Sequence, residues 1–207
     1  MKLLAFVDIH GSPSALKRLE KIAKQEKPDA LVCGGDITIF EQHIEQILGK
    51  LDSIAESIGK KLFIVSGNHE SDEMMQVVCK HLKNTLFIHK KVAKIEGFDD
   101  YVVTGFGGGG FSLVDNDFEV WAKSVLPSLK DKKIIFISHA PPYGNLLDLI
   151  YEEHAGSKSL ARFIKQANPA LVVCGHLHEN ARKQDKIGKT LIINPGAVGA
   201  MVELKLK

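Results

Sequence analysis

The chain has 207 residues, of which 44% are hydrophobic and 25% are charged. This composition supplies one sizeable buried core and excludes a disordered chain, so we expect residues 1–207 to form a single domain. The formal net charge of +2 is too small for the electrostatic surface of a dedicated nucleic-acid-binding protein, although it does not exclude a long polyanion.

Strands and helices are predicted to alternate in the first part of the chain. Aliphatic blocks rich in β-branched residues predict buried strands at 3–7, 30–33 and 62–66. Hydrophobic residues at three-and-four spacing predict amphipathic helices at 14–25 and 41–58, and a third helix is expected at 72–82.

The pattern then changes to short strands that follow one another without a helix. Candidates at 86–89, 92–95 and 101–104 suggest antiparallel pairing. Helices return at 117–129 and 157–167, and strands at 134–138, 170–174 and 190–193. We interpret the glycine run at 107–110 as a turn, because no helix start follows it. The mixture predicts an α/β fold with two packed mixed sheets flanked by helices.

Cysteine spacing and the lack of a long apolar run indicate in which compartment the protein is expected. Cys33, Cys79 and Cys174 show no C-x-x-C spacing, which suggests neither a zinc site nor a disulfide framework, and we expect Cys33 and Cys174, which end apolar runs, to be small buried hydrophobic residues. The sequence shows no apolar run of the roughly 20 residues that a membrane-spanning helix requires. The first apolar block also reaches Asp8 too early for a signal peptide, and we expect a cytoplasmic protein.

Metal-competent side chains follow five of the predicted strands. The carboxyl ends of strands in such sheets meet at one edge, where ligands bind, so these side chains are expected to converge. The residues that we expect to bind metal are Asp8, His10, Asp36, Asn68, His139, His176 and His178.

Imidazole, carboxylate and amide ligands without thiolate suit manganese, zinc, iron or cobalt. In an extended chain, alternate residues point to the same side, so D-x-H and H-x-H could each bind one ion. Seven ligands are more than one ion needs, which indicates two divalent ions bridged by a carboxylate.

The five segments D-x-H, G-D, G-N-H-[ED], H and G-H-x-H, in this order, resemble the signature of the calcineurin-like metallophosphoesterase family, and the later Asn194-Pro195-Gly196-Ala197 resembles its small prokaryotic members. The resemblance spans Asp8 to His178 and implies a four-layer αββα sandwich. It implies one ion bound by Asp8, His10 and His178, a second bound by Asn68, His139 and His176, and Asp36 as the bridge between them. Of the candidate metals we favour manganese.

The resemblance also implies a reaction, in which a hydroxide shared by the two ions attacks a phosphate ester. His69 would act as the general acid near the substrate. Many members carry a second Asp in G-D-x-x-D that orients this histidine, but Ile39 occupies that position here. Because the imidazolium is then less stabilised, we favour phosphodiesters over phosphomonoesters.

Two other functions fit the same pattern: a catalytically weak metal-binding scaffold of this fold, and a nuclease. We favour an enzyme acting on a small phosphate ester, and the sequence does not fix whether it forms a homo-oligomer. Phe111 and Tyr143 lie in loops and are candidates to line the substrate pocket or to cover the core. Glu70 is either a supporting partner of the centre or an acid at a helix start.

Overall fold

The first β-sheet of this computed structural model, which describes residues 1–205, has five strands in the order β13-β1-β2-β3-β4. Strands β1 to β4 are parallel, and β13 from the end of the chain pairs antiparallel with β1. The strands are β1 (Lys2–Phe6), β2 (Ala30–Cys33), β3 (Leu62–Ile64), β4 (Thr85–Phe87) and β13 (Ala200–Glu203), and the helices beside them are α1 (Pro13–Glu26), α2 (Ile44–Ser57) and α3 (Asp72–Cys79).

The second sheet has six strands in the order β11-β12-β10-β7-β6-β5, with a parallel centre and an antiparallel strand at each edge. The strands are β5 (Val92–Ile95), β6 (Phe98–Phe106), β7 (Lys133–Ser138), β10 (Leu171–Val173), β11 (Gln184–Ile187) and β12 (Thr190–Ile193). The helices beside them are α4 (Asn116–Val125), the 3-10 helix η1 (Leu126–Leu129) and α5 (Lys158–Ala167). A small hairpin of β8 (Leu149–Ile150) and β9 (Glu153–His154) and the 3-10 helix η2 (His178–Asn180) complete the described elements.

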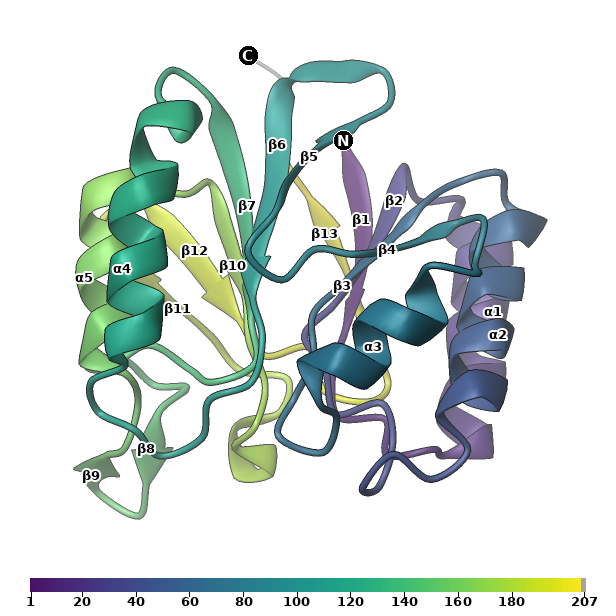
Figure 1. Ribbon diagram of the computed structural model, residues 1–207, viewed down its shortest axis with the longest axis horizontal. Coiled ribbons are helices and arrows are strands. Elements are labelled where there is room, and N and C mark those ends of the chain that lie inside the picture. The colour runs from purple at the N-terminus through teal and green to yellow at the C-terminus, as the bar shows by residue number, and fades with distance from the viewer. Residues whose placement is uncertain (206–207) are drawn as a thin grey trace.

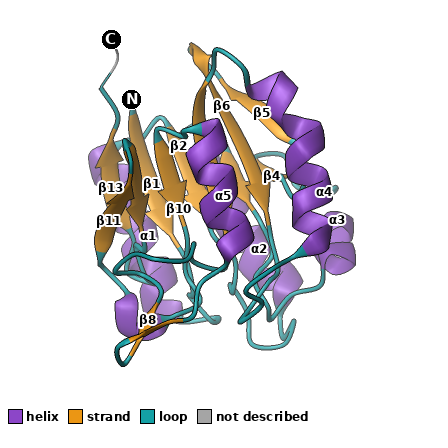
Figure 2. Ribbon diagram, turned by 90° about the vertical axis from the view of Figure 1, so that its left-hand side faces the viewer, coloured by secondary structure: helices purple, strands orange, loops and turns teal. Residues whose placement is uncertain are grey.

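The two sheets face each other between two layers of helices, as Figure 1 shows edge-on. Helices α1, α2 and α3 cover the outer face of the first sheet, and α4 and α5 cover the outer face of the second, with α4 and α5 in front in Figure 2. Three apolar clusters follow from this order, one under each helical layer and one between the sheets. The predicted two-sheet α/β sandwich is confirmed.

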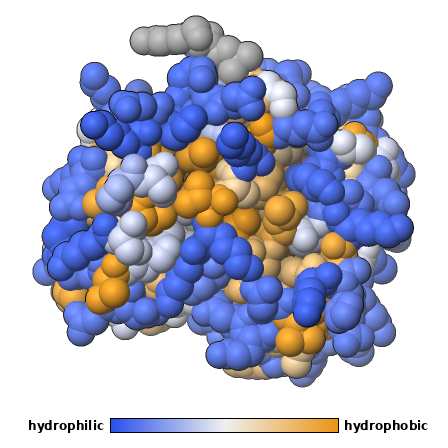
Figure 3. Space-filling view, turned by 45° about the horizontal axis from the view of Figure 1, so that its top comes forward, coloured by the Kyte–Doolittle hydropathy of each residue, from blue (hydrophilic) through white to orange (hydrophobic). Residues whose placement is uncertain are grey.

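Strand β1 shows why the strands are continuous apolar segments in the sequence. Leu4 and Phe6 point into the cluster under α1 and α2, whereas Leu3 and Ala5 point into the cluster between the sheets. A strand that is buried on both faces needs apolar residues at every position. At the face seen in Figure 3, apolar side chains gather in the middle, smaller apolar patches lie toward the lower edges, and hydrophilic side chains cover most of the rest.

Two predictions about pairing and helix bounds were wrong in part. The antiparallel pairing holds for β5 with β6, but β4 pairs parallel with β3 because α3 carries the chain back across the first sheet. The second helix begins at Ile44 rather than at residue 41, since Phe40, Glu41 and His43 have positive φ angles that a helix cannot accommodate.

The predicted burial of Cys33 and Cys174 is confirmed, and Cys79 is buried as well; all three thiols are free. Burial raises the pKa of each thiol, that of Cys79 to about 12. Within residues 1–205, the structure has no helix of the length and apolarity needed to span a membrane.

Candidate metal centre

The loops that follow β1, β2, β3, β7 and β10 meet at one edge of the two sheets, where the parallel strands end (Figure 1). Backbone hydrogen bonds join the loops: the Asp8 N–H donates to the carbonyl of Gly35 at 3.1 Å, and the Gly175 N–H donates to that of His139 at 2.8 Å. The segments predicted to carry metal ligands are therefore neighbours in space.

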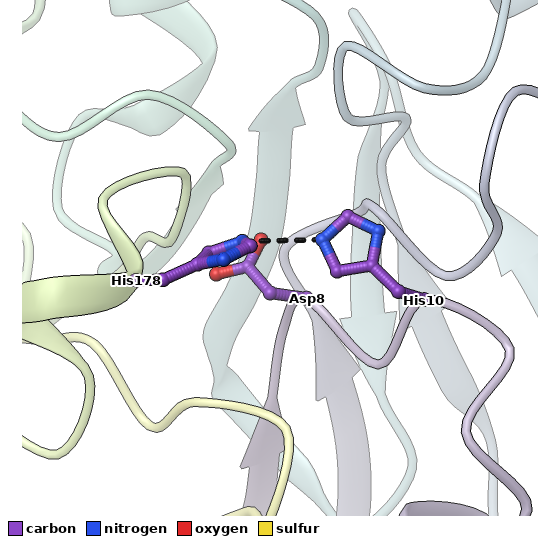
Figure 4. Close-up of side chains that lie close together, drawn as sticks. All are labelled: Asp8, His10 and His178. Atoms are coloured by element: carbon purple, nitrogen blue, oxygen red, sulfur yellow. Dashed lines mark hydrogen bonds between the residues drawn. The ribbon is translucent and has the colours of Figure 1, made fainter.

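The first group of potential ligands consists of Asp8, His10 and His178, shown in Figure 4. Their ligand atoms lie within 4.8 Å of one another, and Nε2 of His10 is 3.1 Å from Nε2 of His178. His10 Nδ1 donates a hydrogen bond to the Thr38 carbonyl at 2.9 Å, which leaves the lone pair of a neutral ring on Nε2. That lone pair faces the other two side chains.

The second group consists of Asn68, His139 and His176. Oδ1 of Asn68 lies 2.9 Å from Nε2 of His139 and 2.9 Å from Nδ1 of His176. His139 Nδ1 donates to the carbonyl of Gly34 at 2.9 Å, so the Nε2 of its neutral ring also carries a lone pair directed into the site. The same arrangement of imidazole and backbone carbonyl thus appears in both groups.

Asp36 lies between the two groups. Its Oδ2 is 3.8 Å from His10 Nε2 and 3.4 Å from His139 Nε2, while its Oδ1 accepts a hydrogen bond from the backbone N–H of His69 at 2.9 Å. A carboxylate in this position can reach an ion held by either group. All seven residues predicted to bind metal are therefore brought together.

The local backbone differs from the extended chain that the sequence suggested. Asp8, His10, Asp36 and His176 all have positive φ angles, between 42° and 70°, so the D-x-H pair converges through tight turns and not through strand alternation. That geometric reason was wrong, although the side chains meet. Gly67 is required beside them, since a Cβ there would collide with the Asp36 carboxylate.

Glu70 is buried beneath this arrangement and connects two of the loops. Its Oε2 accepts from the backbone N–H groups of Asp36 and Gly67, both at 3.0 Å, and its Oε1 accepts from the N–H and the hydroxyl of Thr38 at 2.8 and 2.7 Å. Glu70 is thus a supporting residue of the centre. The acids in the first turn of α3 are Asp72 and Glu73, and Ser71 caps that helix.

The electrostatics of the cluster follow from its burial and its alternating charges. Burial acts to raise the pKa of Asp36, but hydrogen bonding and charge from His139 and His69 outweigh it and lower that pKa to about 2. Burial opposes charge on His139, yet Asp36 and Asp8 raise its pKa. Burial, followed by the charge of His139, lowers the pKa of His176 to about 4, so this ring is neutral and able to bind a metal near pH 7.

The cluster fits a pair of divalent ions. Asp8 Oδ2 and His176 Nε2 are buried in the described structure without a hydrogen-bond partner, which is costly unless a cation or another donor satisfies them. In addition, the Nε2 lone pair of a neutral His139 faces the amide oxygen of Asn68 and the carboxylate of Asp36. Bound cations would relieve these contacts, and the set of imidazole, carboxylate and amide donors suits manganese, zinc, iron or cobalt.

Of the two aromatic residues that the sequence offered as candidates for the substrate pocket, only one lies beside the centre. Phe111 lies against His176, with ring centroids 4.7 Å apart, and so borders the centre. Tyr143 instead packs on His154 and lies under the Lys158 ammonium. Phe40, which sequence reasoning missed, covers His69 at 4.4 Å. A lone phenylalanine in a loop gives no signal that could have found it.

A cavity of about 290 Å³ opens beside His10, between α1 and α2. Its walls carry apolar carbons of Leu16 and Ile47 and polar groups of Gln42, Gln46 and Lys50. The metal centre thus has an adjoining space for a part of a ligand beyond the reacting group.

Comparisons with known proteins agree with this geometry. Residues 1–180 match the family described as Calcineurin-like phosphoesterase. The uncharacterized protein MJ1162 of Methanocaldococcus jannaschii is 32% identical over 203 residues, which cover 94% of this chain and 88% of the relative. The fold is similar to that of TT1561 from Thermus thermophilus (TM-score 0.76, 19% identity, 95% and 89% of the two chains) and of a dimetal phosphatase from Danio rerio (0.63, 10%, 97% and 91%). With its site at the family's expected edge of the sandwich, this chain belongs to the calcineurin-like phosphoesterase family.

Proposed function

We propose that the chain is a metal-dependent phosphodiesterase whose centre binds two divalent ions, with manganese favoured. The observation that carries this proposal is the position of Asp36, whose Oδ2 lies within 4 Å of a histidine from each ligand group. Asp8, His10 and His178 would hold one ion, Asn68, His139 and His176 the other, and Asp36 both. When bound, two such ions would lower the pKa of a shared water and neutralise charge on the phosphoryl oxygens.

His69 is the residue that we assign to proton transfer. Its Nδ1 accepts a hydrogen bond from the backbone N–H of Phe40 at 3.3 Å, which places the ring proton on Nε2. Nε2 points toward the centre, 3.8 Å from Asp36 Oδ2. From there the Nε2–H of the neutral ring can donate a hydrogen bond to the oxygen of the leaving group, and transfer of a proton requires the imidazolium form, in which Nδ1 is protonated and no longer accepts from Phe40.

The proposed preference for diesters rests on which group forms a hydrogen bond with Nδ1 of His69. A backbone N–H group, and not a carboxylate, contacts its Nδ1, and the side chain at the usual position of the acid is Ile39, which is 46% exposed. A histidine without a carboxylate partner stabilises an imidazolium less well, which favours esters with good leaving groups.

The test is metal analysis combined with turnover of bis-p-nitrophenyl phosphate and p-nitrophenyl phosphate. We expect two ions per chain, and faster turnover of the diester. His69→Asn should reduce turnover by about 10²–10⁴-fold and keep both ions, whereas the exposed His81→Asn is the matched control.

Other outcomes would separate the competing functions. Two bound ions without turnover of either ester would indicate the metal-binding scaffold. A steep loss of activity with added salt on single-stranded DNA would indicate a nuclease. Unchanged turnover in His69→Asn would remove the assignment of this residue.

A further inference from the structure

Two large apolar side chains next to the centre are exposed. Phe40 is 72% exposed and Phe111 is 63% exposed, although phenylalanine is among the residues that proteins most often bury. Each ring has one aromatic contact, which is with a histidine of the site: Phe40 with His69 and Phe111 with His176. Neither ring belongs to one of the three apolar clusters.

The backbone fixes Phe40 in place at some cost. Its φ angle is 47° and that of Glu41 is 62°. Both lie in the left-handed region, which residues other than glycine seldom adopt. The conformation is maintained by two hydrogen bonds to one residue, from the Phe40 N–H to His69 Nδ1 and from the Glu41 N–H to the His69 carbonyl at 3.1 Å. Strained backbone that persists in this way is typical of ligand-binding positions.

Phe111 follows the glycine run at 107–110, and the loop that carries it is fixed at both ends. The Gly108 N–H donates to the Ser66 carbonyl at 3.0 Å, and the Leu113 carbonyl accepts from the Lys158 N–H at 2.8 Å. Gly107 passes so close to Ser66 that a Cβ would collide with its backbone. The glycines therefore allow the close approach that brings Phe111 onto His176.

The two rings stand at opposite ends of one series of contacts through the centre. From Phe40 the series runs to His69 and to Asp36, whose Oδ2 is 3.4 Å from His139 Nε2. It continues from His139 through Asn68 to His176 and ends at Phe111. With the leaving group beside His69, as proposed above, Phe40 is the ring nearer the leaving group, and Phe111, at the far end of the series, is the ring available to the retained group.

We propose that Phe40 and Phe111 stack on planar rings carried by the two ester groups of the substrate, so that the preferred class is a dinucleotide-like phosphodiester. This inference rests on the proposed function. Base stacking on aromatic side chains tolerates any base sequence. The small net charge of +2 fits a short diester better than a long polyanion.

The cavity beside His10 and Ile39, which neither Phe40 nor Phe111 lines, is a second place where a planar group of the substrate could bind. Its volume of about 290 Å³ is near the lower end for ligand pockets and suits a group of nucleoside size. Gln42, Gln46 and Lys50 offer amide and ammonium groups there. The edges of a base can hydrogen-bond to such groups, which are exposed at the mouth of the cavity.

The experiment compares two diesters with the same leaving group, thymidine 5′-(p-nitrophenyl phosphate) and ethyl p-nitrophenyl phosphate, on the manganese-loaded protein. Removing a ring that stacks on a base weakens binding by about 5- to 150-fold. Phe111→Ala should therefore raise KM for the thymidine ester by that factor more than KM for the ethyl ester. Phe40→Ala, on the side of the leaving group, should raise KM for both esters by equal factors.

Val120→Ala, which removes an apolar side chain that is 71% exposed on α4, is the control and should leave both KM values as in the wild type. If Phe111→Ala changed both KM values equally or not at all, while the wild type hydrolysed both esters, the stacking role would be refuted and the phosphodiesterase function would stand. If the metal-loaded wild type hydrolysed neither ester, the proposed function and this inference would both fall.

Discussion

Replacing Glu70 by glutamine tests the internal support of the centre. The carboxylate accepts four hydrogen bonds, two on each oxygen, from Asp36, Thr38 and Gly67. A glutamine amide keeps one acceptor oxygen and turns an NH₂ group toward the two remaining donors. Each buried donor left without an acceptor costs about 1–3 kcal/mol, so Glu70→Gln should lower the free energy of unfolding by about 2–6 kcal/mol.

The measurement is urea unfolding of the metal-free protein, with Glu73→Gln as the control because Glu73 is an exposed acid nearby on α3. Calorimetric titration with Mn²⁺ should show that the variant also binds the metal more weakly, since residues that orient metal ligands typically contribute about 10- to 100-fold in affinity. A variant that unfolded within about 0.5 kcal/mol of the wild type, the usual range for surface substitutions, would refute the reasoning.

Three further predictions concern His69, the apolar cluster under α4 and α5, and the three thiols. Ile39→Asp should move the basic limb of the pH–rate profile to higher pH and speed turnover of phosphomonoesters, because a carboxylate would stabilise the imidazolium of His69 and keep the ring protonated at higher pH; an unchanged profile would contradict this. Phe163→Ala, in the cluster under α4 and α5, should lower the free energy of unfolding, measured in urea, by about 3–5 kcal/mol. A decrease below about 1 kcal/mol would contradict the close packing of Phe163 in this cluster. Because burial raises their pKa values, the three cysteines should stay protonated and unreactive toward iodoacetamide at pH 8 and react fully in guanidinium, as mass spectrometry would show; modification of the folded protein within minutes would contradict this.

The fold was predictable where burial on both faces makes a strand read as a continuous apolar block. Strands β1, β2, β7 and β12 are of this kind. Strand β13 was not predicted, because Ala200–Glu203 is short and only Val202 of its four residues is buried. The parallel pairing of β4 was also missed, since pairing depends on where α3 lies and not on the strand's own residues.

The site was predictable in its residue types and their order, since the five segments follow strands that end at one edge. Its local geometry was not predictable. The left-handed turns at Asp8 and His10 involve residues that carry no glycine-like signal. The contact of Phe40 with His69 likewise depends on loop conformation, which tertiary contacts decide.

The two groups of ligands each draw on both sheets, since Asp8 and Asn68 follow strands of the first sheet, while His139 and His178 follow strands of the second. A bound ion would then link the loops of the first sheet to those of the second. Any sliding of one sheet over the other would pull its coordination apart. Overpacking at Val32 or Ile137, which both belong to the cluster between the sheets, should therefore weaken metal binding even though neither residue is one of the ligands.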